Sequence, residues 1–262
     1  IDGTTADISY TPSSSTLTFT WSNFSDAESG IEYYNASIED DDGNSVVAVT
    51  NVGTVTTWTV NNLSLVNAKT YEGVIQAVDY AGNVSTEVSS SVIVDTDGPV
   101  AGQVADRDNN DVEWISSTST TNIHWENFSD TLSGIDHYEY AIGTSLGGSQ
   151  ALAWTNALNT DTSVTVTGLS LTHLTQYYSS VRAVDSVGNV SSAAISDGFT
   201  VDTDVPTITY IREGETGELD IQNVDSVISA RWLGADIATG SGVDFYEVAL
   251  GKNPYRHALG AD

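Results

Sequence analysis

The stretch AVDYAGNVS, residues 77–85, returns as AVDSVGNVS at residues 183–191. Seven of the nine positions are identical, in a chain whose other segments vary loosely among Ser, Thr and Asp. In both copies an apolar Ala-Val pair precedes Asp-x-x-Gly-Asn, which is a turn sequence, and Val-Ser follows it. The stretch therefore predicts the end of one strand, a tight turn and the start of the next strand, twice in one chain.

Longer segments repeat as well. WSNFSDAESGIEYY at 21–34 aligns with WENFSDTLSGIDHY at 125–138, and a weaker copy, WLGADIATGSGVDFYEV, begins at Trp232. The period of about 105 residues is too long for a solenoid unit and suits one sandwich domain per repeat. DTDGPV (95–100) and DTDVPT (202–207) separate the copies, and each proline makes a short, stiff linker. We therefore predict domains at residues 1–97, 98–204 and 205–262, the last being the N-terminal part of a third copy.

Short alternating segments separated by turn residues fill each copy, which is the pattern of an all-β protein. In the first copy the expected strands are 17–21, 31–38, 56–60, 70–78 and 84–95. Asp42-Gly43 lies between two such segments and predicts a hairpin. No segment of useful length has a helical period.

The ends of the sequence suggest a piece of a longer protein. The third copy has no counterpart of the last three strands, and an open half-sandwich would expose its inner face, so we expect the native protein to continue beyond Asp262. The start, IDGTT, has no initiator methionine and indicates a mature or excised segment. No run of about 18 apolar residues is present, so no membrane span is expected in this segment.

The charge balance restricts the partners. The chain carries 36 acidic and 7 basic residues, a formal net charge of −29. This charge disfavours nucleic acids and anionic membranes as partners, because phosphate binding needs a basic surface. The absence of cysteine excludes disulfides, thiolate catalysis and zinc-thiolate sites. Two interpretations of the acidity remain: adaptation to a salty medium, or carboxylates that bind cations.

The repeated region resembles a known family. GLSLTHLTQYYSSVRAVDSVGNVS (168–191) and NLSLVNAKTYEGVIQAVDYAGNVS (62–85) are similar to the E-to-G signature of fibronectin type III modules. Trp21 and Trp125 match the strand-B tryptophan of that family, and Tyr71 and Tyr177 match its strand-F tyrosine. The resemblance covers nearly the whole chain and implies tandem, seven-strand, two-sheet Ig-like β-sandwiches. The FSD-x-x-SGI, YAIGT, GLSL and VDT-x-x-P pieces look more narrowly like tandem modules of large bacterial surface and adhesin proteins.

Residue alternation agrees with the implied sandwich. Tyr71, Ile75 and Ala77 fall on one face of the expected strand F. In the turn that follows, Asp79 can cap backbone amides and Gly82 can supply the positive φ. Asp185 and Gly188 repeat this pair in the second copy.

The implied topology also places acidic loops together, because the B–C and F–G loops lie at the end of a domain where its own chain enters. The first junction would gather Asp95, Asp97, Asp130, Asp185 and Asn189, and the second Asp202, Asp204 and Asp236. Carboxylate and amide oxygens are the ligands that Ca²⁺ prefers. We therefore expect calcium to rigidify the junctions; the alternative is that these residues only cap turns and keep the chain soluble.

Two other acidic stretches are weaker candidates. EDDDGN (39–44) lacks the spacing and the terminal Glu of an EF-hand loop, so it is interpreted as a solvated hairpin. DRDNNDVE (106–113) begins like a calcium loop, but no glycine follows at the required position. We interpret it as a turn, with a cation site as the alternative.

No catalytic constellation is present in the sequence. The four histidines, His124, His137, His173 and His257, lie in unrelated settings without a plausible acid and nucleophile. A string of sandwiches presents convex surfaces rather than the cleft that a catalytic carboxylate pair needs. The chain is therefore expected not to be an enzyme.

The sequence predicts a structural role. We expect a stalk, filament or adhesin shaft of a long extracellular bacterial cell-surface protein. Its partners would be further copies of the repeat in the same chain, and self-assembly into a fibre or layer is a further expectation. One alternative is a spacer or accessory region of a secreted polysaccharide-degrading enzyme. Another is a module that binds a surface glycan or protein, for which the aromatics to inspect are Tyr33, Tyr34, Tyr80 and Trp154.

Overall fold

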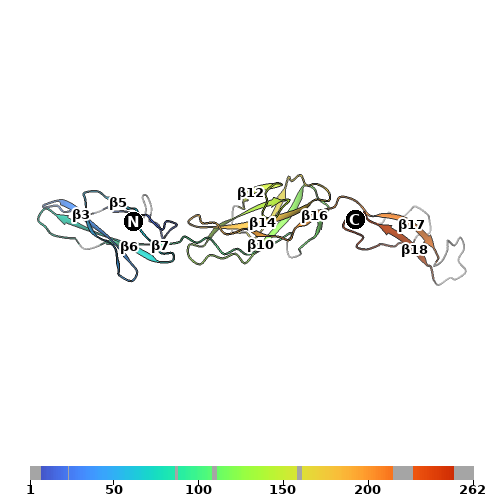
Figure 1. The fold of residues 1–262 in the computed structure, drawn as a ribbon, viewed down its shortest axis with the longest axis horizontal. Helices are drawn as coiled ribbons and strands as arrows, with labels where there is room; N and C mark the ends of the chain where they lie inside the picture. The colour runs from blue at the N-terminus through green and yellow to red at the C-terminus, as the bar shows by residue number, and fades with distance from the viewer. Residues whose placement is uncertain are drawn as a thin grey trace.

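The computed structural model describes residues 7–22, 24–85, 88–107, 111–157, 161–214 and 227–250, and every regular element in these ranges is a β-strand. Figure 1 shows three strand-built units that follow one another along a single long axis. The chain is thus extended, and the all-β architecture expected from the alternating segments is confirmed.

The first unit is a sandwich of two sheets. Its strands are β1 (Tyr10–Thr11), β2 (Leu17–Thr20), β3 (Ile31–Asp40), β4 (Ser45–Gly53), β5 (Thr57–Val60), β6 (Thr70–Asp79) and β7 (Val88–Val94). One sheet has the order β1-β7-β6-β3-β4, and the other pairs β2 with β5. The expected hairpin joins β3 to β4, with Gly43 at a φ of 76°.

The second unit repeats this plan. Its strands are β8 (Gln103–Ala105), β9 (Trp114–Ile115), β10 (Thr120–Glu126), β11 (Ile135–Gly143), β12 (Leu152–Asn156), β13 (Ser163–Thr167), β14 (Gln176–Asp185), β15 (Ala194–Ile195) and β16 (Phe199–Val201). One sheet has the order β13-β10-β8 and the other β12-β11-β14-β16-β9, with β15 paired to β14. This is the A-B-E and C′-C-F-G division of a fibronectin type III-like sandwich.

An aromatic pair fills the centre of each complete unit. Trp125 is 0% exposed, and its ring centroid lies 5.5 Å from that of Tyr138 on β11. In the first unit Trp21 packs edge-on against Tyr34 at the same distance. Tyr34 is therefore a core residue and takes no part in an exposed aromatic face. Burial of such rings contributes several kcal/mol per unit, on the order of 2–3 kcal/mol for each side chain.

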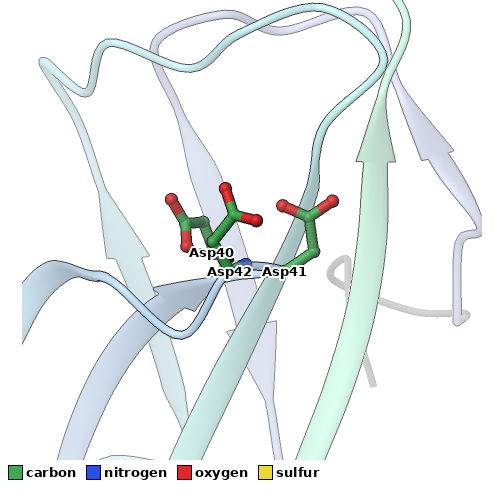
Figure 2. A group of neighbouring side chains, drawn as sticks. All are labelled: Asp40, Asp41 and Asp42. Atoms are coloured by element: carbon green, nitrogen blue, oxygen red, sulfur yellow. Dashed lines mark hydrogen bonds between the residues drawn. The ribbon is translucent and has the colours of Figure 1, made fainter.

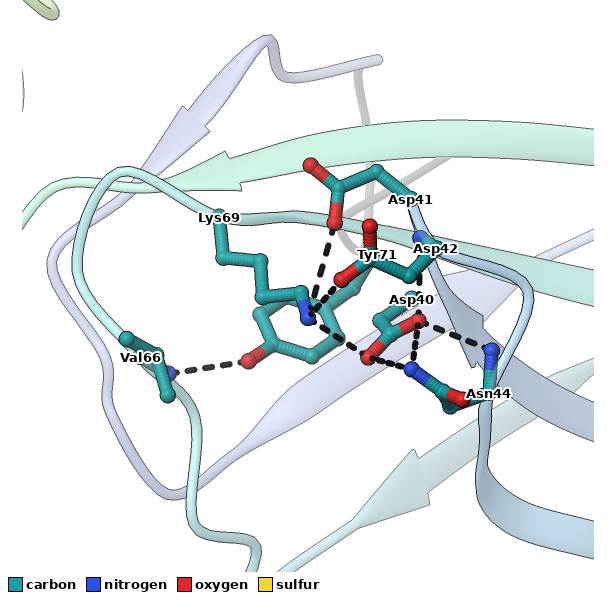
Figure 3. A network of polar contacts seen from close by, with 7 residues as sticks. All are labelled: Asp40, Asp41, Asp42, Asn44, Val66, Lys69 and Tyr71. Atoms are coloured by element: carbon teal, nitrogen blue, oxygen red, sulfur yellow. Dashed lines mark hydrogen bonds and ion pairs between the residues drawn. The ribbon is translucent and has the colours of Figure 1, made fainter.

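The tyrosines of strand F join the core to the preceding loop. The backbone N–H of Val66 donates to the hydroxyl of Tyr71 at 2.9 Å, as Figure 3 shows, and Thr172 donates to Tyr177 at 3.0 Å. Since both tyrosines are buried, each bond satisfies a polar tip that would otherwise be unpaired. The loop before β6 or β14 is thereby fixed in the same way in both units.

The third unit is the hairpin of β17 (Thr207–Glu213) and β18 (Ala230–Ala235), antiparallel to each other. Trp232, the counterpart of the two core tryptophans, is 37% exposed. Its ring packs at 5.8 Å against Tyr246, within the stretch that follows β18. Residues 251–262, with His257, lie outside the described residues.

Candidate metal centre at the first junction

Three aspartates from separate segments meet where the first unit joins the second. Asp95 directly follows β7, Asp130 lies in the loop between β10 and β11, and Asp185 ends β14. One carboxylate oxygen of each lies within 4.8 Å of the other two. The structure thus brings together three of the residues that the sequence placed at this junction.

The loop after β10 holds Asp95 across the junction. The backbone N–H of Ser133 donates to Oδ2 of Asp95 at 3.0 Å. In the same loop Asp130 Oδ1 accepts from the N–H groups of Leu132, at 3.0 Å, and Gly134, at 2.7 Å. This Asx turn points the loop amides toward the linker and leaves Oδ2 of Asp130 free of these bonds.

The F–G turn orients the third carboxylate. Asp185 Oδ1 accepts from the N–H groups of Val187, at 3.0 Å, and Asn189, at 2.8 Å. Gly188 has a φ of 95°, which a residue with a Cβ rarely adopts. In the first unit Asp79 and Gly82 make the same turn, as the sequence predicts.

Asn189 binds the linker through its nitrogen. Its Nδ2 lies 2.9 Å from the carbonyl oxygen of Asp95, 3.3 Å from that of Asp97 and 2.8 Å from Oδ2 of Asp185. The side chain therefore faces the junction as a hydrogen-bond donor, and its role is to clamp the linker onto the turn.

The charges of the site have no cationic partner in the described part of the chain. Asp95 is 0% and Asp185 2% exposed, and no lysine, arginine or histidine that the structure describes forms an ion pair with Asp95, Asp130 or Asp185. Two unit charges 4 Å apart repel by about 4 kcal/mol at an effective dielectric constant of 20. Three carboxylates so close, two of them buried, are stable together when a cation lies among them.

Two buried oxygen atoms of the junction residues have no hydrogen-bond partner in the part of the chain that the structure describes. They are Oδ1 of Asp95 and the hydroxyl Oγ of Ser133. Buried polar atoms are nearly always satisfied, so each unsatisfied one calls for a specific explanation. The three carboxylates are hard oxygen ligands, which suit Ca²⁺ with its six to eight oxygens better than the strictly octahedral, water-retaining Mg²⁺.

Asp97 lies outside this cluster. Its Oδ2 accepts from Nδ2 of Asn67 at 2.8 Å, and Oδ1 of Asn67 accepts from the N–H of Thr96 at the same distance. The side chain of Asp97 is thus turned back onto the first unit.

The second junction is built in a similar way from fewer carboxylates. Asp202 Oδ2 accepts from the N–H of Ser241 at 2.7 Å, and Asp236 Oδ2 accepts from Gly242 at 2.9 Å. Hydrogen bonds from Ser241, chiefly that from its backbone N–H, lower the pKa of Asp202. Asp204 instead lies 3.5 Å from Nε2 of His173. A third carboxylate, the counterpart of Asp185, is not found among the residues described there.

The hairpin between β3 and β4 holds an acidic cluster that is paired with a lysine. Figure 2 shows Asp40, Asp41 and Asp42 close together at its tip. In Figure 3 the ammonium group of Lys69 lies among them, 2.7 Å from Asp40 Oδ2 and 2.9 Å from Asp42 Oδ2. Its hydrogen bond holds the pKa of Asp40 well below the usual range, and Asp40 in turn raises the pKa of Lys69.

A third acidic group in the second unit joins the buried Asp106 with the exposed Asp111 and Asp197. Burial raises the pKa of Asp106, which is 1% exposed. Both of its oxygens have donors, the hydroxyl of Ser179 at 2.5 Å and the N–H of Gly198 at 3.2 Å. The turn interpretation of 106–113 can be followed only in part, because residues 108–110 lie outside the described ranges.

The strand order and these repeated loops decide the fold. The fold is that of fibronectin type III-like β-sandwiches in tandem. No family model matches the sequence. Among curated proteins, Exoglucanase B of Cellulomonas fimi is 28% identical over 206 residues, which cover 77% of this chain and 18% of that protein. The chain thus spans less than a fifth of that relative.

Solved structures show a more distant likeness. The fibronectin(III)-like modules of Clostridium thermocellum CbhA align with a TM-score of 0.43 and 10% identity, over 77% of this chain and 93% of theirs. Chicken CNTN1 FN1–FN3 domains align with a TM-score of 0.42 and 16% identity, over 77% and 66% of the two chains. Within the described residues no helix is long and apolar enough to cross a membrane.

Proposed function

We propose that this chain is a non-catalytic extracellular spacer whose modules are held end to end by calcium bound among Asp95, Asp130 and Asp185. The observation that carries the proposal is the buried Oδ1 of Asp95, for which the described residues offer no hydrogen-bond partner. Asp95 belongs to one module, while both neighbouring carboxylates belong to the next. An ion with ligands from two modules binds only when the modules are docked.

Mass action then stiffens the rod. A ligand that binds only the docked state stabilises it by RT ln(1 + [L]/Kd), about 2.7 kcal/mol at one hundred times Kd. Without the ion the three carboxylates repel one another, and this repulsion opposes the bond between Ser133 and Asp95. Calcium therefore removes the carboxylate repulsion at the first junction and holds the two modules in a fixed orientation.

Thermal unfolding of the whole chain tests this proposal. We expect sub-millimolar calcium, added after EDTA at fixed ionic strength, to raise the melting temperature, and an equal concentration of magnesium to raise it less. Asp185→Asn should abolish the calcium effect. Asp161→Asn removes one exposed charge of the same module and should leave the effect intact.

Small-angle X-ray scattering supplies a second readout. Calcium should narrow the distribution of particle lengths, because fewer chains are bent at the first junction. The longest particles should keep the length of the rod with docked modules. If calcium acts no differently from magnesium in melting and scattering, the acidic junction is a solubility feature and the proposal fails.

The exoglucanase similarity favours one setting for such a spacer, a secreted polysaccharide-degrading enzyme. In that setting the modules hold a catalytic domain away from another part of the protein. A shaft of a surface protein, the role expected from the sequence, would use the same rod. The coding sequence on both sides of these residues distinguishes the two, since it encodes either a catalytic domain or further repeats with a surface anchor.

A further inference from the structure

The first module has a hollow at the end that faces away from the second. The hollow is open to solvent and measures about 200 Å³; it is lined in part by Phe24, Ser25 and Asp26 of the B–C loop and by Val84 and Ser85 after the F–G turn. These residues correspond one by one to Phe128, Ser129, Asp130, Val190 and Ser191 in the second module.

In the second module the linker from the preceding module fills the equivalent place. Val100 and Ser129 exchange two backbone hydrogen bonds, at 2.8 and 3.2 Å. Gly98 passes so close to Val190 that a Cβ would lie 2.5 Å from its carbonyl oxygen. Within the described residues of the first module, Ser25 makes no such backbone pair.

The partner of the B–C loop serine differs between the modules. Where the loop binds the last aspartate of a preceding module, the serine N–H donates to that aspartate. Ser133 and Ser241 donate their N–H groups to Asp95 and Asp202, the aspartates that end the preceding modules. Ser29, their counterpart in the first module, turns back on its own loop. Its N–H and hydroxyl donate to Oδ2 of Asp26, at 3.2 and 2.6 Å.

We propose that the hollow and the loop Asp26–Gly30 form a docking site for the last strand and linker of another module of this kind. The partner is a segment of the type Val-Asp-Thr-Asp, which occurs at both 94–97 and 201–204 of this chain. Its first aspartate takes the N–H of Ser29, and a divalent cation bridges it to Asp26 and Asp79. The inference rests on the proposed calcium-held junction, because it applies the same ligand arrangement to a new surface.

Asp79 is already oriented for this role. Its Oδ1 accepts from the N–H groups of Ala81 and Asn83, and its Oδ2 accepts from Nδ2 of Asn83 at 2.7 Å, as Asp185 does in its own turn. The free Nδ2 hydrogen of Asn83 can then clamp the incoming linker, as Asn189 clamps residues 95 and 97. Docking therefore requires the release of the Ser29 N–H from Asp26.

A tethered segment tests the proposal without depending on affinity in solution. Residues 1–6 are replaced by a copy of Val94–Ala105, which raises the local concentration of the segment to the millimolar range. We expect one more bound calcium per chain than in the unmodified protein, and calcium-dependent shifts of the Ser29 and Gly30 amide resonances. The matched control carries Asn in place of the aspartate copied from Asp95, and should lose both effects.

The first junction serves as the internal reference. If the Ser133 and Gly134 amides respond to calcium while Ser29 and Gly30 do not, the docking site is refuted and the proposed function stands. If neither pair responds, the calcium-held junction itself fails. An unchanged unfolding transition in EDTA shows that the graft has not disturbed the first module.

Discussion

The backbone nitrogen of Ser133 lies 3.0 Å from Oδ2 of Asp95, so a loop of the second module binds the residue that ends the first. The contact joins segments 38 positions apart and requires the two modules to be in line. It also fixes the carboxylate of Asp95 with its other oxygen, Oδ1, buried beside two further aspartates. A single hydrogen bond thus couples module orientation to the formation of the proposed ion site.

Asp95→Asn should separate the charge of this residue from its hydrogen bonds. The amide oxygen can still accept from Ser133, but one of the three negative charges is lost. We expect calcium affinity at the junction to fall at least tenfold, about 1.4 kcal/mol. In EDTA the variant should melt at or above the wild-type temperature, because the repulsion is relieved. Calorimetry in EDTA and in calcium measures both effects.

Asp97→Asn is the matched control for that variant, since it changes the same residue type two positions along the linker. Asp97 is bound to Asn67 and lies outside the cluster. The calcium response should persist. If Asp97→Asn instead lost the calcium response, the carboxylate of Asp97 would be a ligand of the ion.

The two F–G turns allow a second comparison. Asp79→Asn and Asp185→Asn remove equivalent capping carboxylates. In EDTA, Asp79→Asn should lower the melting temperature more, because at Asp185 the lost capping is offset by reduced repulsion from Asp95 and Asp130. Thermal unfolding of both variants, without calcium, checks the order. The reverse order would mean that the three junction aspartates do not repel one another.

The sequence predicted the repeated sandwich because its evidence is local. The alternation of Tyr71, Ile75 and Ala77 places all three in the core, where each is less than 5% exposed. The topology implied by the family resemblance also sufficed to place Asp95, Asp130 and Asp185 at one junction. Positions that follow from strand order and loop length can be predicted in this way.

Side-chain directions in the linker could not be predicted. Asp95 and Asp97 are two residues apart, and only Asn67, thirty positions before Asp97, decides that Asp97 turns away. The unsatisfied hydroxyl of Ser133 was likewise missed, although the Ser-Gly of FSD-x-x-SG marked the position. Lys69 contacts Asp42 in the β3–β4 hairpin although the two residues are 27 positions apart. No local sequence pattern predicts this pairing.

The buried carboxyl of Asp106 predicts a pH dependence of the second module. Burial raises its pKa above the usual value of 3.8, so the folded state binds a proton more readily than the unfolded chain. Stability from this group therefore rises as the pH falls through its folded pKa and declines as the pH increases. Asp106→Asn mimics the protonated form, and its stability relative to wild type should be greatest at neutral pH and decrease toward pH 4.

Urea unfolding at several pH values between 4 and 7 measures this difference. Asp111 also faces Asp106 and raises its pKa, so Asp111→Asn is a useful second variant. It should reduce the pH dependence without abolishing it, because burial is the larger cause. A constant difference between wild type and Asp106→Asn across this range would show that the carboxyl titrates normally.

Lys69→Met should convert the β3–β4 hairpin into a weak cation site. The ammonium group now pairs with Asp40, Asp41 and Asp42 and offsets one of their three negative charges; its loss leaves three clustered carboxylates. The pKa of Asp40 should rise toward its ordinary value, since the hydrogen bond from Lys69 is the largest cause of its depression. The lowered pKa of Asp40 stabilises the folded wild-type protein above pH 3.8, and this contribution to the free energy of unfolding should be smaller in Lys69→Met.

Carboxylate titration by NMR follows this change directly, with Asp79 as the internal control. Its pKa is lowered chiefly by Asn83, and should not respond to Lys69→Met. The melting temperature should fall only slightly, and more at low salt, because exposed ion pairs contribute little and are screened. New calcium-dependent shifts at Asp40 and Asp42 in the variant, absent from the wild type, would establish that the lysine occupies the place of a cation. Their absence would show that three aspartates on an exposed hairpin need buried oxygens, such as those at the junction, to bind calcium.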